Sequence, residues 1–356
     1  MNARTHLAAT AATALLLSAA AAALLSSAPA ARADSVADFY RGKQLTILVG
    51  YGAGGGYDSN TRLLAKHFSK HIPGNPAIVV QNMPGAGSMK VANFVYNAAP
   101  KDGTTLGVFA ASTALEPLFG NDNAKYDPRS FAWIGSMHQD VASCAIWKGG
   151  GQNIATLDDL MKAKNTVLFG STAPAAITSQ HALVLQHYLE APVKVIYGYK
   201  GTKGVSLAME QGEVHASCGM FESSVKGAFS SQIASGEMKI FVQFGPDSAV
   251  PYFGNATRLY ERMKSPEDRQ VLDTIFRQTQ LARPLAAPPD TPADRVAALR
   301  KAMLAAFADP DLIADAKAIK VEFNPMSGDE AQALIERFYE TPEPLLKKAM
   351  ALIGRD

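Results

Sequence analysis

The stretch between Gln44 and Leu64 has the residue types and the order of an anion-binding site. An apolar run at 45–49 is predicted to form a buried strand, and apolar residues at helical spacing resume after Asp58. Glycine has no Cβ, so a ligand can come close to the main chain. The start of a helix offers unpaired N–H groups and a partial positive charge. A tight turn alone needs fewer glycines, so the pattern favours an anion site. The glycines between strand and helix are Gly50, Gly52, Gly54, Gly55 and Gly56.

The same loop fits a dinucleotide fingerprint only in part. Gly50-x-Gly52-x-x-Gly55 lies between a predicted strand and a predicted helix, as that fingerprint requires. The fingerprint also needs an acidic residue about 20 residues further on to hold the ribose. No Asp or Glu occurs between Ser59 and Lys101. We therefore expect no nucleotide cofactor.

Other patterns that could support catalysis or metal binding are incomplete. His67 and His71 are spaced i, i+4, but the glutamate of an H-E-x-x-H motif is missing. Their place near a helix end is explained by the helix dipole. Ser223 and Lys226 have the spacing of a Ser/Lys acyl-enzyme pair, but no K-T-G or G-x-S-x-G motif accompanies them. The sequence therefore predicts no catalytic residue, no metal and no enzyme activity.

Residues 1–33 are predicted to be a signal peptide. Arg4 precedes an apolar run at 7–25, and Ala31-Arg32-Ala33 fits the cleavage pattern of small residues. The run approaches the length of a membrane anchor, which is the competing interpretation, but the cleavage pattern follows it directly. We expect cleavage after Ala33 and a soluble, exported chain that starts at Asp34.

The mature chain is long enough for two domains and has no net charge. Removal of the leader leaves 356 − 33 = 323 residues, and 34 − 2 = 32 basic residues against 32 acidic ones. This balance argues against nucleic acid or an anionic membrane as a partner. The acid-free stretch 59–101 contains five basic residues, which favours an anionic ligand near the glycine loop. The five are Arg62, Lys66, Lys70, Lys90 and Lys101.

Cys144 and Cys218 are the only cysteines. In an oxidising compartment they are expected either to form one disulfide or to remain two separate buried thiols. The sequence leaves both possibilities open.

Strands and helices alternate along most of the chain. Strands predicted at 45–49, 77–81 and 105–109 flank a second glycine turn and a helix at 89–97. A second set of strands is expected at 167–170, 193–197 and 214–220, with a return strand at 239–244. Alternation of this kind indicates βαβ units and parallel sheets, with ligands beyond the carboxyl ends of the strands. We expect an α/β fold with two lobes and crossings near 135–145 and 240–250.

Several segments together resemble the Bug family of periplasmic solute receptors, which serve tripartite tricarboxylate transporters. The resemblance covers nearly the whole mature chain, closely in the first lobe and loosely in the C-terminal helices. The ordered set of motifs is more specific than any one of them. The residues that carry it are 52–58 with Arg62, 79–87, 100–103, Tyr199-Lys200-Gly201 and Gly212-Glu213-Val214.

The resemblance implies a type II periplasmic-binding fold that clamps a ligand between two lobes. Lobe 1 would comprise 34–138 and 245–356, and lobe 2 would comprise 139–244. Asp58 would fix the loop or the helix start rather than touch an anion. The carboxylate cradle would be Tyr51, Gly52, Ala53, Gly54, Gly55, Gly56 and Tyr57. Gly87, Ser88, Ser112 and Thr113 would be neighbouring turns of the same lobe, and Ser171, Thr172, Ala173 and Tyr199 would close from the second lobe.

The sequence departs from the family pattern at Gly219. Many family members carry an acid at the end of this strand, where it can meet an amino group. With glycine there, an amino acid or a cationic ligand is less expected than a plain carboxylic acid.

The resemblance therefore implies a monomeric periplasmic receptor that binds a small organic carboxylate and delivers it to a membrane permease. A di- or tricarboxylate or an aromatic acid is expected as ligand. One alternative is a sensor that presents its closed form to a signalling membrane protein. A second alternative is an exported α/β enzyme that uses the glycine loop for a nucleotide.

Overall fold

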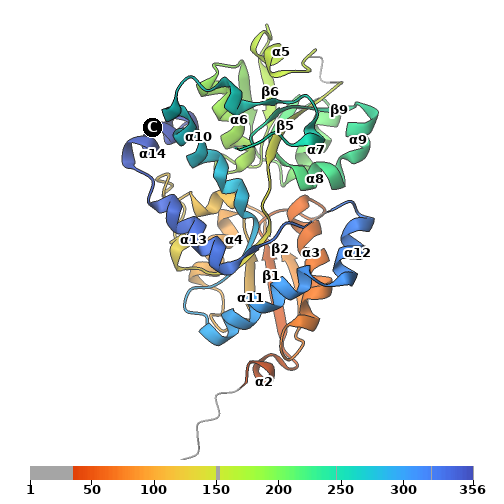
Figure 1. The fold of residues 1–356 in the computed structure, drawn as a ribbon, viewed down its shortest axis with the longest axis vertical. Helices are drawn as coiled ribbons and strands as arrows, with labels where there is room; N and C mark the ends of the chain where they lie inside the picture. Colours follow the sequence, from red (N-terminus) through yellow and green to blue (C-terminus); the bar gives the residue numbers. More distant parts are fainter. Residues whose placement is uncertain (1–34, 150–152, 246, 322, 356) are drawn as a thin grey trace, which may run out of the picture.

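Two six-stranded sheets organise the chain (Figure 1). The structure is a computed structural model that describes residues 35–149, 153–245, 247–321 and 323–355. The predicted signal peptide lies outside these residues. Of the helices that the structure describes, none combines the length and the apolar character needed to cross a membrane.

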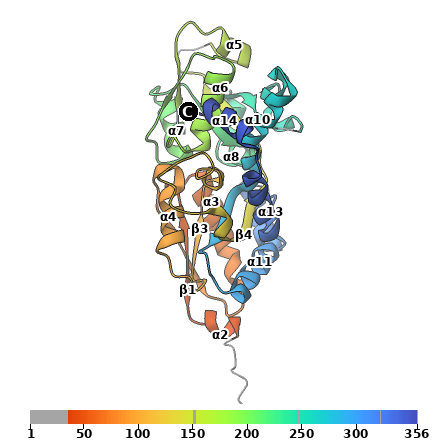
Figure 2. The same cartoon turned by 90° about the vertical axis from the view of Figure 1, so that its left-hand side faces the viewer.

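The first sheet has the order β12-β4-β11-β3-β1-β2. β1 pairs in parallel with β2 and β3, whereas β11 runs antiparallel to both β3 and β4. Figure 2 shows α4 on one side of this sheet and α11 and α13 on the other. The strands are β1 (Gln44–Val49), β2 (Ala77–Asn82), β3 (Thr105–Val108), β4 (Ala132–His138), β11 (Ala282–Ala287) and β12 (Met326–Ser327). The helices are α2 (Val36–Tyr40), α3 (Gly56–Phe68), α4 (Met89–Asn97), α11 (Ala293–Phe307), α12 (Pro310–Ala318) and α13 (Gly328–Tyr339).

The second sheet has the order β10-β9-β5-β8-β6-β7. The C-terminal helix α14 (Glu343–Leu352) contacts α10 and α6, so it belongs spatially with this sheet. The strands are β5 (Ala142–Trp147), β6 (Val167–Gly170), β7 (Val193–Ile196), β8 (Ala216–Phe221), β9 (Met238–Gln243) and β10 (Thr257–Arg258). The helices are α5 (Leu157–Met161), α6 (Ile177–Tyr188), α7 (Thr202–Glu210), α8 (Glu222–Ala228), α9 (Ser230–Ser235) and α10 (Pro266–Phe276).

Both sheets are mixed rather than parallel throughout, which corrects the sequence-based expectation. In each sheet the strand that enters from the other lobe runs antiparallel to its neighbours, and in the first sheet the short strand β12 is also antiparallel to β4. β5 follows the first crossing and runs antiparallel to β8 and β9, and β11 follows the second crossing. A strand that returns across the boundary must run against its neighbours, so the two-lobed topology itself requires this reversal.

The first crossing is where the sequence placed it, and the second is not. β4 ends at His138 and β5 begins at Ala142, within the expected range. The chain then stays with the second sheet beyond residue 250, because β10 pairs with β9. It returns only through the 3₁₀ helix η7 (Arg277–Leu281), which leads into β11. The segment 245–281 and the C-terminal helix α14, both expected in lobe 1, therefore lie with lobe 2. The chain thus crosses a third time between α13 and α14, whereas two crossings were expected.

Local capping signals set several helix starts. Capping boxes at Thr156 and Ser327 begin α5 and α13. At the start of α11, Pro292 occupies the N-cap position. The Thr291 hydroxyl donates to the carbonyl of Pro288.

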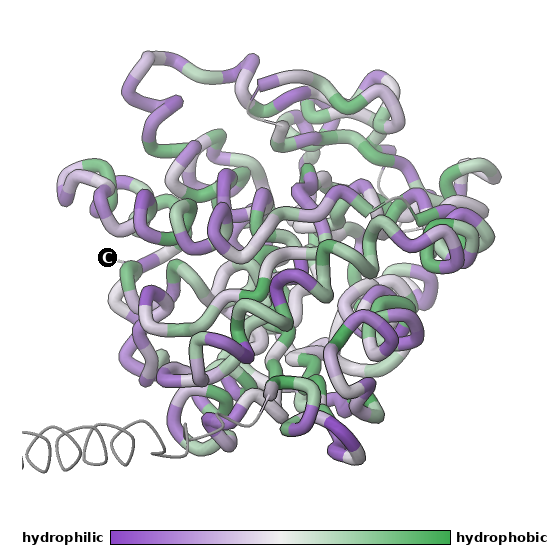
Figure 3. The backbone as a smooth tube through the Cα atoms, turned by 60° about the horizontal axis from the view of Figure 1, so that its bottom comes forward, coloured by the Kyte–Doolittle hydropathy of each residue, from purple (hydrophilic) through white to green (hydrophobic). Residues whose placement is uncertain are grey.

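The buried side chains of both lobes are mostly apolar, and hydrophilic residues are frequent along the outer backbone (Figure 3). A disulfide joins Cys144 on β5 to Cys218 on the neighbouring strand β8. Of the two possibilities left open by the sequence, the structure therefore has the bonded pair.

Candidate ligand-binding site

A cavity lies between the two lobes, at the carboxyl ends of their strands. Its volume is about 30 Å³, enough for a small polar head group or a few water molecules. Lobe 1 contributes the glycine loop and β11, and lobe 2 contributes three turns that follow β6, β7 and β8. The lining residues are Tyr51, Gly56, Tyr57, Thr172, Ile177, Thr178, Thr202, Gly219, Phe221, Ser224 and Arg283.

Three helix N-termini face this cavity. α3 begins with Gly56, α6 begins with Ile177, and α7 begins with Thr202, and all three residues line the cavity. The starts of α3 and α7 approach closely, because a Cβ on Gly55 would lie 4.0 Å from the amide nitrogen of Thr202. The first N–H groups of a helix have no intrahelical acceptor and carry partial positive charge. One helix start from lobe 1 and two from lobe 2 therefore direct positive potential into one space.

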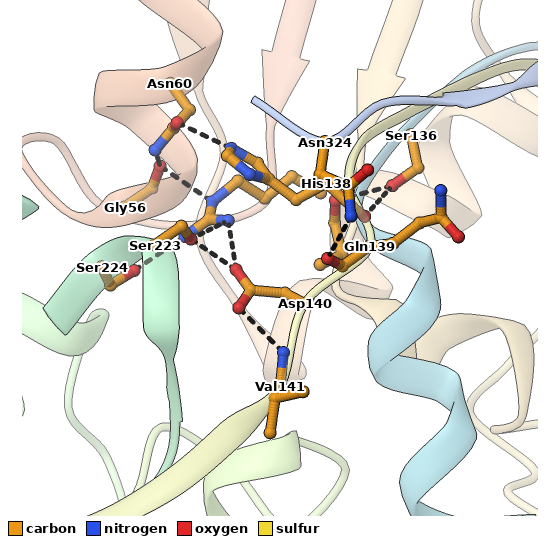
Figure 4. A network of polar contacts seen from close by, with 12 residues as sticks. Gly56, Asn60, Ser136, His138, Gln139, Asp140, Val141, Ser223, Ser224 and Asn324 are labelled. Carbon is orange, nitrogen blue, oxygen red and sulfur yellow. Dashed lines mark hydrogen bonds and ion pairs between the residues drawn. The ribbon is translucent and has the colours of Figure 1, made fainter. Parts of the chain in front are cut away.

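Arg283 adds a buried cation to the wall. Its side chain donates to Ser223 Oγ at 2.8 Å and to Ser224 Oγ at 2.7 Å, both on α8 of lobe 2. Its Nε donates to the carbonyl oxygen of Gly56 at 3.2 Å, and Asp140 lies 3.5 Å away as counter-ion. Figure 4 shows this network around the first crossing. Arg283 thus connects the glycine loop, the first crossing at Asp140 and lobe 2.

The backbone of Arg283 is held in an unusual conformation. Its φ is +59°, and the residue is fully buried. A non-glycine residue in the left-handed region carries strain, which persists only where surrounding contacts hold it. Burial lowers the pKa of the guanidinium, and Asp140 opposes this shift. An arginine remains cationic after such a shift.

Aromatic rings close the cavity on the side of Arg283. The rings of Tyr51 and Tyr57 lie 4.6 Å apart, and Phe221 of lobe 2 is 6.4 Å from Tyr57. The guanidinium of Arg283 lies 5.7 Å from the Tyr57 ring and 5.2 Å from the Phe221 ring. Burial raises the pKa of Tyr57 to about 12 and also raises the pKa of Tyr51 well above its ordinary value. Both phenols are therefore protonated hydrogen-bond donors at neutral pH.

Asp58 supports the glycine loop from behind. Its carboxylate accepts from the N–H of Gly54 at 2.8 Å, from Arg62 at 2.9 Å and from Asn82 at 2.8 Å. Asp58 does not line the central cavity. This arrangement matches the role expected for Asp58, which was to fix the loop rather than to meet an anion.

The glycines of the site also allow the lobes to touch. The N–H of Gly52 donates to the carbonyl of Lys200 at 2.9 Å, and a Cβ on Gly52 would lie 3.0 Å from that oxygen. A Cβ on Gly87 would lie 3.2 Å from the amide nitrogen of Ala176 in lobe 2. The second glycine turn therefore meets lobe 2 as closely as the first. The structure has the lobes in contact, which is a closed arrangement.

The expected site residues divide into groups by position. Tyr51, Gly56, Tyr57, Thr172 and Gly219 line the central cavity. Gly54 and Gly55 line a groove on one side of it, and Gly87 and Tyr199 line a hollow on the other side. Gly52 and Ala173 lie at contacts between the lobes. The residues outside these three spaces are Gly52, Ala53, Asp58, Ser88, Ser112, Thr113, Ser171 and Ala173.

Hydrogen bonds within one lobe explain three of the residues outside these spaces. Ser88 Oγ accepts from the N–H of Ala110, and Thr113 donates to the carbonyl of the same residue. Ser171 Oγ bonds to Thr178 Oγ1. These hydroxyls hold the turns in place beneath the cavity.

Sequence reasoning missed six residues of the cavity wall. Four of them, at 177, 178, 202 and 224, lie in the first turns of helices that follow lobe 2 strands. Their position just after a predicted strand could have identified them from the sequence. Arg283 could have been identified in a different way, because it is a single charged residue within an apolar strand. The missed residues are Ile177, Thr178, Thr202, Phe221, Ser224 and Arg283.

The structure also accounts for the two histidines that were weighed as metal ligands. His67 bonds to Asp315 at 2.7 Å, and His71 bonds to Asp309 at 2.7 Å. A possible ligand set of His67, Asp309 and Asp311 exists among the described residues. Lys70 occupies it, with Nζ 2.6 Å from Asp309 and 2.9 Å from Asp311. The cluster ties α3 to α12 by ion pairs.

Ser223 and Lys226 are not arranged as a nucleophile and its base. Ser223 Oγ accepts from Arg283 and donates to Asp140 at 2.5 Å. Lys226 pairs with Glu222 at 2.7 Å. A hydroxyl that accepts from a guanidinium and donates to a carboxylate serves the connection between the lobes.

The fold is that of the two-lobed periplasmic binding proteins. No family model matches the chain. The structure is similar to that of the periplasmic binding protein BugD, with a TM-score of 0.70 and 22% identity over 87% of this chain and 98% of that one. It is also similar to MatC from Rhodopseudomonas palustris, solved with bound malate, with a TM-score of 0.65 and 18% identity over 88% of this chain and 99% of that one.

A shorter likeness at the level of sequence points the same way. Over 78 residues the chain is 40% identical to a UPF0065 protein from Cupriavidus necator. The match spans 22% of this chain and 23% of the length of that relative. The resemblance to Bug-type receptors is thus supported by the fold over most of the chain and by one segment of sequence.

Proposed function

We propose that the protein is a periplasmic receptor that holds the carboxylate of a small organic acid between its lobes and delivers it to a membrane permease. The permease would be of the tripartite tricarboxylate type. The observation that carries the proposal is the convergence of three helix N-termini on one cavity between the lobes. The receptor would bind its ligand without changing it chemically.

The charge of the cavity suits one carboxylate. Each helix start acts as about half a positive charge, so three of them present roughly 1.5. Arg283 is already balanced by Asp140. None of the described residues that line the central cavity is acidic. An anion placed there would meet donors from both lobes and no like charge.

The same wall disfavours a cationic ligand. Gly219 has a φ of +68°, and a Cβ there would lie 2.8 Å from the amide nitrogen of Thr178. An acidic side chain at this position would therefore be both strained and obstructed. A ligand with an amino group would find no carboxylate among the described residues of the cavity wall.

Closure is needed for useful affinity. Hydrogen bonds to a charged group each contribute about 1.5–3 kcal/mol, so three donors from one loop contribute roughly 5–9. Association costs about 4–15 kcal/mol, whereas micromolar binding needs about 8 net. One loop cannot supply this. Donors from α6 and α7, together with exclusion of water as lobe 2 closes, would supply the remainder.

The similar structures agree with this proposal. BugD is a periplasmic binding protein, and MatC was solved with malate. Export to the periplasm would also suit a chain with a disulfide in lobe 2. Interaction with a permease is proposed from the likeness to these receptors.

A thermal-shift screen of residues 34–356 tests the proposal. The panel would hold mono-, di- and tricarboxylates, aromatic acids, amino acids, phosphate and a nicotinamide dinucleotide. A ligand at 1,000 times its Kd adds about 4 kcal/mol to the free energy of unfolding. We expect a higher Tm with one class of carboxylate. A rise only with the dinucleotide would favour an enzyme instead.

Two matched variants separate charge from shape. Thr202→Asp places a carboxylate at the start of α7, where an acid suits the helix, so the variant should fold. It should abolish binding of the carboxylate, because the site would already hold a negative charge. Thr202→Asn has the same shape and no charge, and it should retain binding. Equal affinities for the two variants would contradict an anion site at this cavity.

A further inference from the structure

A groove adjoins the central cavity and runs along α7. Its volume is about 320 Å³, and it runs between α7 and the segment that joins α8 to α9, with the glycine loop at one end. Gly56, Thr202 and Ser224 line both the groove and the central cavity. The two spaces therefore adjoin each other at these residues.

The groove changes polarity along its length. Lys203, Leu207 and Glu210 lie at i, i+4 and i+7, so they share one face of α7. The ammonium of Lys203 is near the glycine loop, 3.5 Å from where a Cβ of Gly54 would be. Glu210 is about 10 Å further along the helix axis, from the rise of an α-helix. The groove is thus basic at the cavity end and acidic at the far end.

The middle of the groove is apolar. Leu207 is 50% exposed, and the ring of Phe229 is buried against the groove. Gln232 joins Glu210 among the polar lining residues. No ion-pair partner of Lys203 or Glu210 occurs in the part of the chain that the structure describes.

The central cavity is too small for a whole organic acid, so the body of the ligand must leave it. The hollow on the opposite side shares Tyr51 and Thr172 with the cavity and has a volume of about 300 Å³. Turns of the two glycine segments and Lys200 line that hollow, and no acid occurs among its described lining residues. Only the groove along α7 offers a basic end, an apolar middle and an acidic end in that order.

We propose that this groove holds the body of an amphipathic monocarboxylate whose far end donates a hydrogen bond to Glu210. The proposal rests on the carboxylate site proposed above and names the class of ligand for it. The carboxylate would lie at the helix starts beside Lys203, an aromatic or similar apolar body would cover Leu207 and Phe229, and a hydroxyl would reach Glu210. A ligand with a second carboxylate at that end would be repelled.

Three matched acids test this polarity. Cinnamate has the carboxylate and the aromatic body. 4-Hydroxycinnamate adds a hydrogen-bond donor at the far end, and 4-carboxycinnamate has a second carboxylate there instead. Malate serves as a short acid that reaches only the carboxylate site. Affinities would be measured by titration calorimetry on residues 34–356. We expect 4-hydroxycinnamate to bind about threefold to tenfold more tightly than cinnamate, and 4-carboxycinnamate to bind more weakly than either.

A charge-neutral variant of the far end provides the second arm. Glu210→Gln should bring the affinities for 4-hydroxycinnamate and 4-carboxycinnamate together, because the carboxylate that distinguishes them is gone. Glu190→Gln removes an exposed carboxylate elsewhere on lobe 2 and should leave the ranking as it is in the unaltered protein. Both glutamates are exposed, so neither change should disturb folding.

The possible outcomes distinguish failure of the groove assignment from failure of the proposed carboxylate site. Equal binding of the three cinnamates, or a ranking that Glu210→Gln does not alter, would overturn the groove assignment and leave the carboxylate site intact. Binding of malate alone would do the same. Failure of every carboxylate, malate included, would overturn the proposed function and with it this inference.

Discussion

A methyl group added at Gly52 should weaken ligand binding without weakening the folded lobes. The N–H of Gly52 donates to the carbonyl of Lys200 across the lobe boundary at 2.9 Å. Gly52 has no positive φ, so alanine fits the loop conformation of lobe 1. The obstruction therefore arises only where lobe 2 approaches. Gly52→Ala tests whether this contact belongs to the closed, ligand-holding state.

The magnitude follows from the contact distances. A Cβ on Gly52 would lie 3.0 Å from the Lys200 oxygen, whereas ordinary contacts begin at 3.4 Å, so the lobes must separate by 3.4 − 3.0 = 0.4 Å here. That shift weakens or breaks a hydrogen bond with a net value of about 0.5–1.5 kcal/mol. The Kd should rise about twofold to tenfold. Meanwhile Gly→Ala should stabilise the ligand-free protein by about 0.4–1 kcal/mol, because the unfolded chain loses freedom.

Calorimetry and thermal unfolding read these two effects separately. The titrant is the carboxylate that raises the Tm most in the screen. Gly204→Ala is the control, because it adds the same methyl group on α7, where the nearest atom would be 3.9 Å away. That variant should keep its affinity. An unchanged Kd for Gly52→Ala, or a lower Tm of its ligand-free form, would refute the reasoning.

Two further predictions concern the charged residues around the loop. Arg283→Met leaves Asp140 buried without its counter-ion, so urea denaturation should show a free energy of unfolding lower by about 3–5 kcal/mol. The double variant Arg283→Met with Asp140→Leu should recover most of this lost stability. Burial tends to raise the pKa of Asp58, but Arg62, the N–H of Gly54 and Asn82 lower it below its usual 3.8 overall. The stability that this carboxylate contributes is therefore complete above pH 3.8 and is lost as the pH falls through the lowered pKa. Asp58→Asn should lower the Tm at neutral pH. The difference in Tm between this variant and the unaltered protein should shrink as the pH falls below 3.8, and a difference that stays constant with pH would contradict this account.

Much of the site could be predicted because it depends on local sequence. The glycine loop, the strand before it and the helix after it are one continuous segment, and short-range rules fix their order. The role of Asp58 also follows from its place in the first turn of that helix. The second glycine turn near Gly87 is found in the same way.

The remainder depends on contacts between distant segments. Arg283 lies far along the chain from Gly56, and only the return of β11 beside β4 brings its side chain to the loop. The second crossing was misplaced because β10 has only two residues, Thr257–Arg258, which leave no periodic pattern. Gly52 was expected to bind the ligand, whereas its N–H bonds to Lys200 of lobe 2. A sequence shows that a loop can be approached closely, but not which partner approaches it.

The disulfide between Cys144 and Cys218 bears on the order in which the chain matures. It closes a loop between residues 74 positions apart, which adds about 4 kcal/mol of stability to a folded domain. Such a bond persists only in an oxidising compartment. If the chain is exported as proposed, β5 and β8 pair without this bond before export, and lobe 2 of the precursor is then less stable than lobe 2 of the exported protein. On this proposed route, the lower stability of the precursor would suit passage through a membrane channel, and the disulfide would form after translocation.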